Sequence, residues 1–199
     1  ESELATDPSG HLFTTRGDMD YTELSRLGQG WQTMQTTATA ALVARPTTLT
    51  GLELFNNNSA GSGLHMVIDR LFTHELVTST TGLGGGAIIY AMVTTEKAAP
   101  SSAGLVVVGN SGKAYNGSVV NAVGTSVTAN GWFPWGAHIK KESAGAVVPG
   151  GGAEAMVNGR LIVPPQCSLC VTVVSGYAAD TFTSGASWYE KAFTTMVVQ

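Results

Sequence analysis

The sequence is poor in charged residues. Only 12% of its 199 residues are Asp, Glu, Lys or Arg, whereas an ordinary soluble domain carries about 25%. The basic residues are scattered, with only Lys140 and Lys141 adjacent, and the formal net charge is −4. Nucleic-acid binding requires clustered positive charge, so we expect no nucleic-acid partner. A hydrophobic content of 43% excludes a disordered polyelectrolyte. We expect a folded chain whose apolar surface is partly covered by partner subunits.

No apolar run is suited to crossing a membrane. The best candidate is residues 161–179, which carry no charge but contain Pro164, Pro165, Gln166 and several hydroxyl residues. This composition is too polar and too broken for a spanning helix, and it favours a buried strand instead. Residues 1–10 contain three acids and no apolar run, so they predict no secretory signal. We therefore expect no membrane partner.

Cysteine is also scarce, with only Cys167 and Cys170 in the chain. The two residues lie in a strand-like run, where the rise per residue places their Cα atoms about 10 Å apart. A disulfide requires a separation below about 7 Å. We therefore predict two free cysteines that serve as small core residues.

Patterns typical of catalysis, cofactor binding and metal binding are missing from the sequence. Residues 109–114 suggest a phosphate-binding loop, but Val107 occupies the place of its first glycine and Ala114 that of the magnesium-binding hydroxyl. The four histidines lack the spacing of a zinc site, and no Gly-x-Ser-x-Gly sequence indicates a hydrolase. We predict no catalytic residue, no cofactor and no metal, and hence a protein that is not an enzyme.

The densest group of ionisable residues comprises Asp69, Arg70, His74 and Glu75. On a strand, alternation places Asp69 and Glu75 on one face and Arg70 and His74 on the other. This separation is unsuitable for a pair of catalytic acids and bases. It favours an exposed edge or salt bridges between subunits.

What the sequence does contain is short runs of Val, Ile, Thr and aromatic residues, separated by Gly, Asn and Pro. This pattern is typical of antiparallel strands. Ten short strands predict an all-β fold, an antiparallel β-sandwich or jelly roll. The predicted strands are residues 47–55, 64–77, 87–95, 105–108, 114–123, 126–129, 153–157, 161–163, 167–175 and 186–193.

Asn-Gly occurs three times, and this dipeptide favours tight turns with positive φ. We predict that Asn158-Gly159 reverses the chain, so that residues 153–157 and 160–163 form a hairpin. Pro164 and Pro165 then end the pairing because proline lacks a backbone donor.

The segment before Pro46 has a different character. Residues 20–27 predict about two helical turns, ended by Gly28 and Gly30. Residues 31–44 are rich in Thr, Ala and Gln and carry no charge, so we expect them to lack a core of their own. We predict an extended or partly helical N-terminal arm, residues 1–46, followed by a β-sandwich domain, residues 47–199.

Three large aromatic residues fall within four positions at residues 132–135. They cannot all face one core, and aromatic residues often anchor interfaces. Core closure, a subunit interface and a carbohydrate-stacking site all remain open for this cluster. Together with the arm, it provides the candidate interface residues Tyr21, Leu24, Trp31, Trp132, Phe133 and Trp135.

Two stretches carry a resemblance to a known family. Residues 52–68 combine a short strand, an Asn/Ser/Gly loop and a long strand, and residues 159–176 contain Pro164-Pro165 before an apolar strand, with Trp188 in the closing segment. Together with residues 21–28, these stretches resemble small β-sandwich or jelly-roll virion proteins of tailed bacteriophages. The resemblance covers about half of the chain, and its motifs are structural.

The resemblance implies a virion localisation and a structural role, namely a decoration or cement protein on the capsid. Its partners would be the major capsid protein or other virion proteins, and analogy favours a homotrimer clamped in place by the arm. The alternative is a carbohydrate-binding or host-recognition module at the tail, neck or a fibre. In that case Trp132, Trp135 and Tyr115 would serve as stacking platforms.

Overall fold

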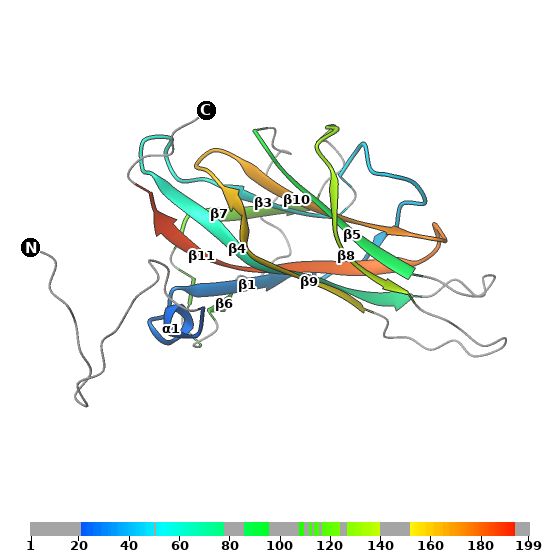
Figure 1. Cartoon of the computed structure of the whole chain (residues 1–199), viewed down its shortest axis with the longest axis horizontal. Helices are drawn as coiled ribbons and strands as arrows, with labels where there is room; N and C mark the ends of the chain where they lie inside the picture. Colours follow the sequence, from blue (N-terminus) through cyan, green and yellow to red (C-terminus); the bar gives the residue numbers. More distant parts are fainter. Residues whose placement is uncertain are drawn as a thin grey trace, which may run out of the picture.

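The chain forms two antiparallel sheets that pack face to face, as a computed structural model shows (Figure 1). The structure describes residues 21–49, 51–77, 86–95, 108–109, 112, 114–115, 117–123, 127–139 and 152–193. Residues 1–20, which belong to the predicted arm, and residues 105–107 of a predicted strand lie outside the described residues.

Sheet 1 has the strand order β6-β1-β11-β4-β9, with β2 also paired to β11. Sheet 2 has the order β7-β3-β10-β5-β8. The strands of sheet 1 are β1 (Gly30–Met34), β2 (Thr39–Ala40), β4 (Leu64–Val77), β6 (Val108–Gly109), β9 (Gly152–Val163) and β11 (Thr181–Ala192). The strands of sheet 2 are β3 (Leu52–Asn56), β5 (Gly86–Thr94), β7 (Val119–Val123), β8 (Phe133–Ile139) and β10 (Ser168–Ser175).

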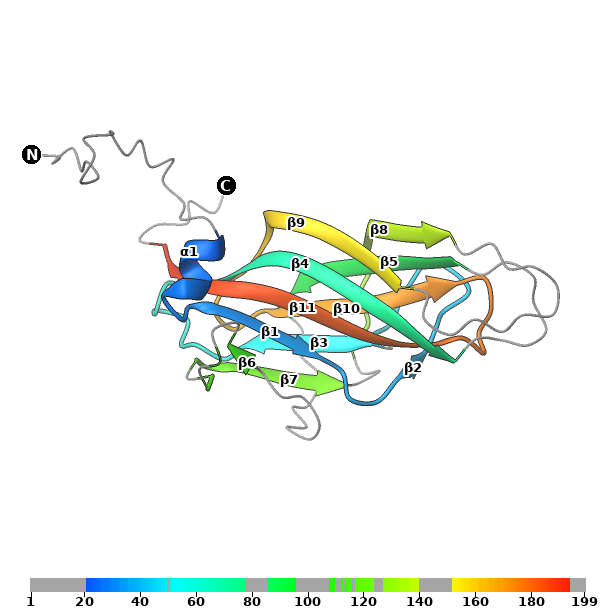
Figure 2. The same ribbon diagram turned by 90° about the horizontal axis from the view of Figure 1, so that it is seen from below.

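The connections between the strands are those of a jelly roll. The chain passes repeatedly from one sheet to the other, so that β1-β11-β4-β9 faces β3-β10-β5-β8, the eight-stranded double Greek key of this architecture. The short strands β6 and β7 follow β5 and extend the two sheets at one edge, while β8 and β9 run along the opposite edge (Figure 2). The predicted all-β sandwich is confirmed.

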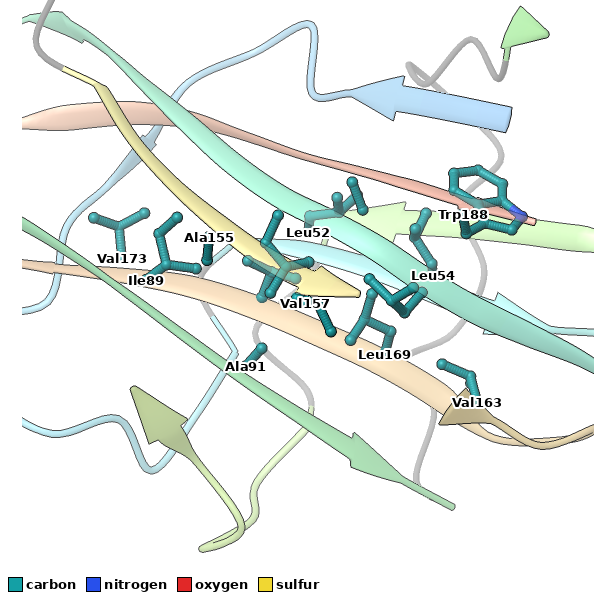
Figure 3. Close-up of a cluster of buried hydrophobic side chains, with 14 of the residues drawn as sticks. Leu52, Leu54, Ile89, Ala91, Ala155, Val157, Val163, Leu169, Val173 and Trp188 are labelled. Atoms are coloured by element: carbon teal, nitrogen blue, oxygen red, sulfur yellow. The ribbon is translucent and has the colours of Figure 1, made fainter. Parts of the chain in front are cut away.

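The core lies between the sheets because alternate residues of each strand point inward. From β10 of sheet 2, Leu169 and Val173 meet Ala155 and Val157 from β9 of sheet 1 (Figure 3). Trp188 on β11 is also completely buried. Each large apolar side chain removed from water stabilises the fold by about 1.5–3 kcal/mol.

The predicted boundary at residue 46 does not separate an arm from the sandwich, because β1 is an inner strand of sheet 1. It pairs with β11 along its whole length and with β6 on its other side. Alternation directs Trp31 into the core, where it is 5% exposed. The Thr/Ala/Gln-rich composition predicted a segment that contributes no core. The prediction failed because Trp31, a single large residue in this segment, inserts into the core of the sandwich. Residues 21–46 therefore belong to the sandwich.

The predicted helical turns at the start of this segment are confirmed. Helix α1 (Tyr21–Arg26) is followed by Gly28, which has a φ of 72°. The Gly28 amide donates to the Ser25 carbonyl and the Gln29 amide to the Leu24 carbonyl, so the last carbonyls of the helix are satisfied. With six residues, this helix is far too short to cross a bilayer, and no described helix is long and apolar enough to do so.

The hairpin predicted at Asn158-Gly159 is wrong. Both residues have positive φ, 50° and 74°, but the chain does not reverse there, and β9 continues along the same partner strand. Ile68 of β4 pairs with Leu161 and Arg70 pairs with Met156, so the turn bulges out of one long strand. Sequence predicts the local conformation but does not reveal that both flanking segments pair with β4.

The remaining predicted strands differ in their outcomes. Residues 64–77 coincide with β4, and residues 87–95 and 167–175 match β5 and β10 closely. Residues 127–129, the described part of the strand predicted at 126–129, form only an isolated bridge, between Thr128 and Thr48. Strands β1 and β8 were missed because Gln, Thr, Pro and Gly interrupt their apolar patterns.

The outer face of sheet 2 is covered by the chain itself. Leu49, Val127 and Trp132 pack with Met92 of β5 and Cys170 of β10 in a second buried cluster. The two connecting segments that contribute these residues therefore cover the part of that face around Met92 and Cys170. As predicted, Cys167 and Cys170 form no disulfide with each other, and Cys170 is a small buried residue of this cluster, whereas Cys167 is half-buried.

Candidate contact surface on sheet 1

Along the strands of sheet 1, residues that point to the outer face alternate with residues that point into the core. The outer residues include both polar and apolar side chains. On β4, Arg70, Phe72 and His74 point outward, whereas Thr73 and Glu75 are buried. The predicted separation of Glu75 from Arg70 and His74 is thus confirmed. Asp69 falls at the register shift between Ile68 and Arg70, where it accepts a hydrogen bond of 3.5 Å from Ser187 Oγ.

A shallow groove of about 500 Å³ crosses this face. Three strands of sheet 1 supply its walls, and β4 runs through the middle. The lining side chains that point outward are Gln32 of β1, Arg70, Phe72 and His74 of β4, and Glu154 of β9.

Two glycines shape the groove because each leaves room for a ring on the neighbouring strand. Gly185 on β11 pairs with Phe72, and a Cβ at Gly185 would overlap the Phe72 ring. Gly152 on β9 pairs with His74, and a Cβ there would lie 3.2 Å from His74 Nδ1. The Phe72 ring therefore fills the space that a side chain at position 185 would need, and the His74 ring lies beside Gly152.

One ion pair crosses the groove. Arg70 Nη1 donates to Glu154 Oε1 at 2.9 Å, and the side chains are 39% and 53% exposed. Arg70 Cζ lies 5.6 Å from the centre of the Phe72 ring. An exposed pair of this kind contributes about 0–1 kcal/mol to folding. The pair therefore adds little to the stability of the fold.

Exposed apolar side chains flank the groove. Met34, Leu76 and Met156 are 40%, 52% and 53% exposed and belong to β1, β4 and β9. They are half of the six large apolar side chains that are exposed among the described residues. Met, Arg and aromatic residues are enriched at protein interfaces, and Lys, Glu and Asp are depleted there. On this surface Met34, Met156, Phe72 and Arg70 belong to the enriched types, and Glu154 belongs to a depleted one.

Three of the six predicted interface residues lie inside the protomer. Leu24, Trp31 and Trp132 are 6%, 5% and 2% exposed, so their burial requires no partner subunit. Trp132 was grouped with its neighbours by sequence, but it closes the second cluster on sheet 2. Of the alternatives that the sequence left open for Trp132, the structure selects core closure.

The other three predicted residues remain accessible to different degrees. Tyr21 is half-buried, and its hydroxyl donates to the Trp31 carbonyl at 3.3 Å. Phe133 is 65% exposed and contacts half-buried Trp135 edge-on, with ring centres 6.4 Å apart. Trp135 packs against the main core, and its Nε1 is buried without an acceptor. Of these three, only Phe133 is freely available to a partner.

Tyr115, the third predicted stacking platform, is half-buried among other aromatic rings. Its ring lies edge-on to Trp31, with centres 4.9 Å apart, and 6.2 Å from the ring of Trp188. Its hydroxyl donates to Glu190. Tyr115 therefore takes part in closing the core and does not form a platform with residues 132–135.

Comparisons with known proteins leave the family open. Searches against protein-family models, curated proteins and solved structures found no match. The bacteriophage resemblance therefore stays a prediction. In the described part of the chain, no group of three or more His, Cys, Asp or Glu side chains is arranged to hold a metal ion.

Sequence reasoning missed most of the surface on sheet 1. It named Arg70 and His74 but not Glu154, which lies 84 positions away in sequence. It gave no role to Phe72, Met34 or Met156 because their neighbours depend on strand register. The available signal was the alternation within residues 64–77, which places Arg70, Phe72 and His74 on one face.

Proposed function

We propose that the chain is a structural subunit of a tailed-bacteriophage virion, a capsid decoration or cement protein. It assembles with neighbouring virion subunits through the outer face of sheet 1. The jelly-roll fold suits this role, since viral capsid domains use the same architecture. A low charge content, 12% of residues, suits permanent interfaces, which are more apolar than transient ones.

The contrast between the two sheets carries the proposal. The outer face of sheet 2 is covered by the chain's own segments, whereas the outer face of sheet 1 presents Met34, Leu76 and Met156 to solvent. Exposed apolar surface gathered on one face marks an interaction site in soluble proteins, and half of the exposed large apolar side chains of the described residues lie on this face. A partner subunit is the natural cover for such a face.

A rebinding experiment on virions of the phage that encodes the chain tests this proposal. The particles are stripped of the protein and then incubated with the purified wild type or with the Met156→Glu variant. We expect the variant to occupy far fewer sites, because a carboxylate buried in an apolar contact costs several kcal/mol. Occupancy is measured by quantitative mass spectrometry and by immunogold electron microscopy.

The matched control is Leu27→Glu, which changes an exposed leucine just after α1 that does not line the groove. It should rebind like the wild type. Equal occupancy by the wild type and Met156→Glu, or absence of the protein from virions, contradicts the proposal.

The second candidate function is host recognition through a carbohydrate, and exposed Phe133 next to Trp135 favours it. An array of bacterial surface oligosaccharides tests this function with the wild type and Phe133→Ala. Binding that Phe133→Ala abolishes supports it. Trp132→Ala is unsuitable for the test because Trp132 is 2% exposed and holds the second cluster together.

A further inference from the structure

We propose that the outer face of sheet 1 binds the same face of a second copy of this chain, with Arg70 of each copy paired to Glu154 of the other. This inference rests on the proposed function, because it names the partner of the same surface. It also specifies twofold symmetry, in place of the trimer implied by the resemblance.

Charge argues for a self-complementary contact. Two copies that each carry a net charge of −4 repel one another, so they meet best where the local charge is balanced. In the groove, the charge of Arg70 is matched by that of Glu154, 2.9 Å away. Neither a strongly acidic nor a strongly basic partner complements such a surface.

The side-by-side placement of the two charges also fits a twofold axis. A twofold contact is isologous, so if residue i meets residue j, then j also meets i. When the two faces meet in opposite directions, each Arg70 faces Glu154 of the second copy. Both side chains are partly exposed, 39% and 53%, which leaves polar atoms of each for pairing across the interface.

Shape supports the same arrangement. The groove, about 500 Å³ in volume, lies between Met34 on β1 and Met156 on β9. Methionine side chains are flexible and fill irregular apolar spaces, so those of one copy can enter the groove of the other. Two sheet faces pack about 10 Å apart, with interdigitated side chains, and the Phe72 ring, which occupies the space next to Gly185, leaves room for that approach.

A charge-swap experiment with two single variants tests the inference. Arg70→Glu leaves two carboxylates side by side in the groove of one chain, and Glu154→Arg leaves two guanidinium groups in the groove of the other. Each variant alone would bring four like charges together, so we expect each to dimerise at least about tenfold more weakly than the wild type. An equimolar mixture should form a heterodimer, because every acidic group then faces a basic group.

Native mass spectrometry and sedimentation velocity measure the assembly state, and circular dichroism confirms that each variant is folded. The matched control is the exposed pair on α1, where Arg26 Nη2 contacts Glu23. The variants Arg26→Glu and Glu23→Arg should dimerise like the wild type. Because each groove variant keeps like charges within its own chain, recovery in the mixture requires pairing between chains.

A wild-type dimer, weakened single variants and a heterodimeric mixture support the inference. A monomeric or trimeric wild type overturns it, and so does a mixture of folded variants that fails to dimerise. The proposed function is judged separately by the particle assay. If Met156→Glu fails to rebind particles while the wild type is monomeric in solution, the dimer alone is refuted. A wild-type dimer that is absent from virions refutes the proposed function alone.

Discussion

At the scale of single residues, Tyr115 connects the aromatic side chains of the core to polar groups on β7 and β11. Its ring packs edge-on against both Trp31 of β1 and Trp188 of β11, which are paired residues of these two strands. Its hydroxyl donates to Glu190 Oε1 at 2.5 Å and accepts from the Val119 amide at 2.8 Å. Burial, together with the hydrogen bond to Glu190, raises the pKa of Tyr115 above its ordinary range. The fold therefore favours the neutral phenol.

This preference predicts a loss of stability at alkaline pH. In the unfolded chain the tyrosine pKa is about 10, and in the folded chain it is higher, so the unfolded state releases its proton first. The stabilisation is complete below pH about 10 and declines as the pH rises beyond that value. Chemical denaturation between neutral pH and pH about 11 measures the effect.

Tyr115→Phe is the matched variant for that measurement. It should reduce the free energy of unfolding by about 1–3 kcal/mol at neutral pH, since the Val119 amide and Glu190 lose a hydrogen-bond partner. It should also flatten the alkaline decline. An unchanged pH profile in the variant would assign that decline to other groups.

At the scale of elements, the bulge in β9 shows how far local sequence signals extend. Asn-Gly correctly predicts positive φ at both positions, because these residues tolerate the left-handed region at low cost. Whether such a turn makes a hairpin or a bulge depends on which strands pair, and here both sides pair with β4. Pairing is a tertiary property, so the dipeptide alone does not determine it.

Gly159→Ala tests the bulge. The φ of 74° at Gly159 disfavours any side chain, and a Cβ would lie 3.3 Å from Val67 Cγ1. We expect the variant to lose about 1–2 kcal/mol of unfolding free energy, measured by thermal and urea denaturation. The control Gly176→Ala places its Cβ in open space and should cost less. Equal losses at both positions would contradict the strained geometry.

At the scale of the whole molecule, fold class followed from the sequence more readily than the site did. Ten runs of β-branched and aromatic residues, separated by turn residues, were enough to predict a sandwich. The contact surface requires Arg70, Phe72 and Glu154 to meet across β4 and β9, and no local pattern encodes that register. The covering of sheet 2 by Leu49, Val127 and Trp132 likewise depends on tertiary structure.

The inner position of β1 predicts what truncation does to the molecule. Removal of residues 1–46 deletes β1 and the Trp31 side chain, so β11 loses a paired neighbour and the core gains a large cavity. Replacing a buried tryptophan by alanine alone costs about 3–5 kcal/mol, and we expect this truncation to abolish cooperative unfolding. Removal of residues 1–20 alone keeps β1, so this shorter truncation is the control. Differential scanning calorimetry measures whether each truncated protein unfolds in a cooperative transition. Such a transition in the protein that lacks residues 1–46 would show that β1 is dispensable.

The pairing of β1 with β11 has a consequence for biosynthesis. One strand begins at residue 30 and the other ends at residue 192, so nearly all of the described chain must leave the ribosome before they meet. Until then β1 carries an unpaired edge and an exposed tryptophan, a state that favours aggregation. Such long-range pairing also slows folding. Sheet 1 therefore closes only after β11 has been synthesised, and the β1 edge next to β11 stays open until then.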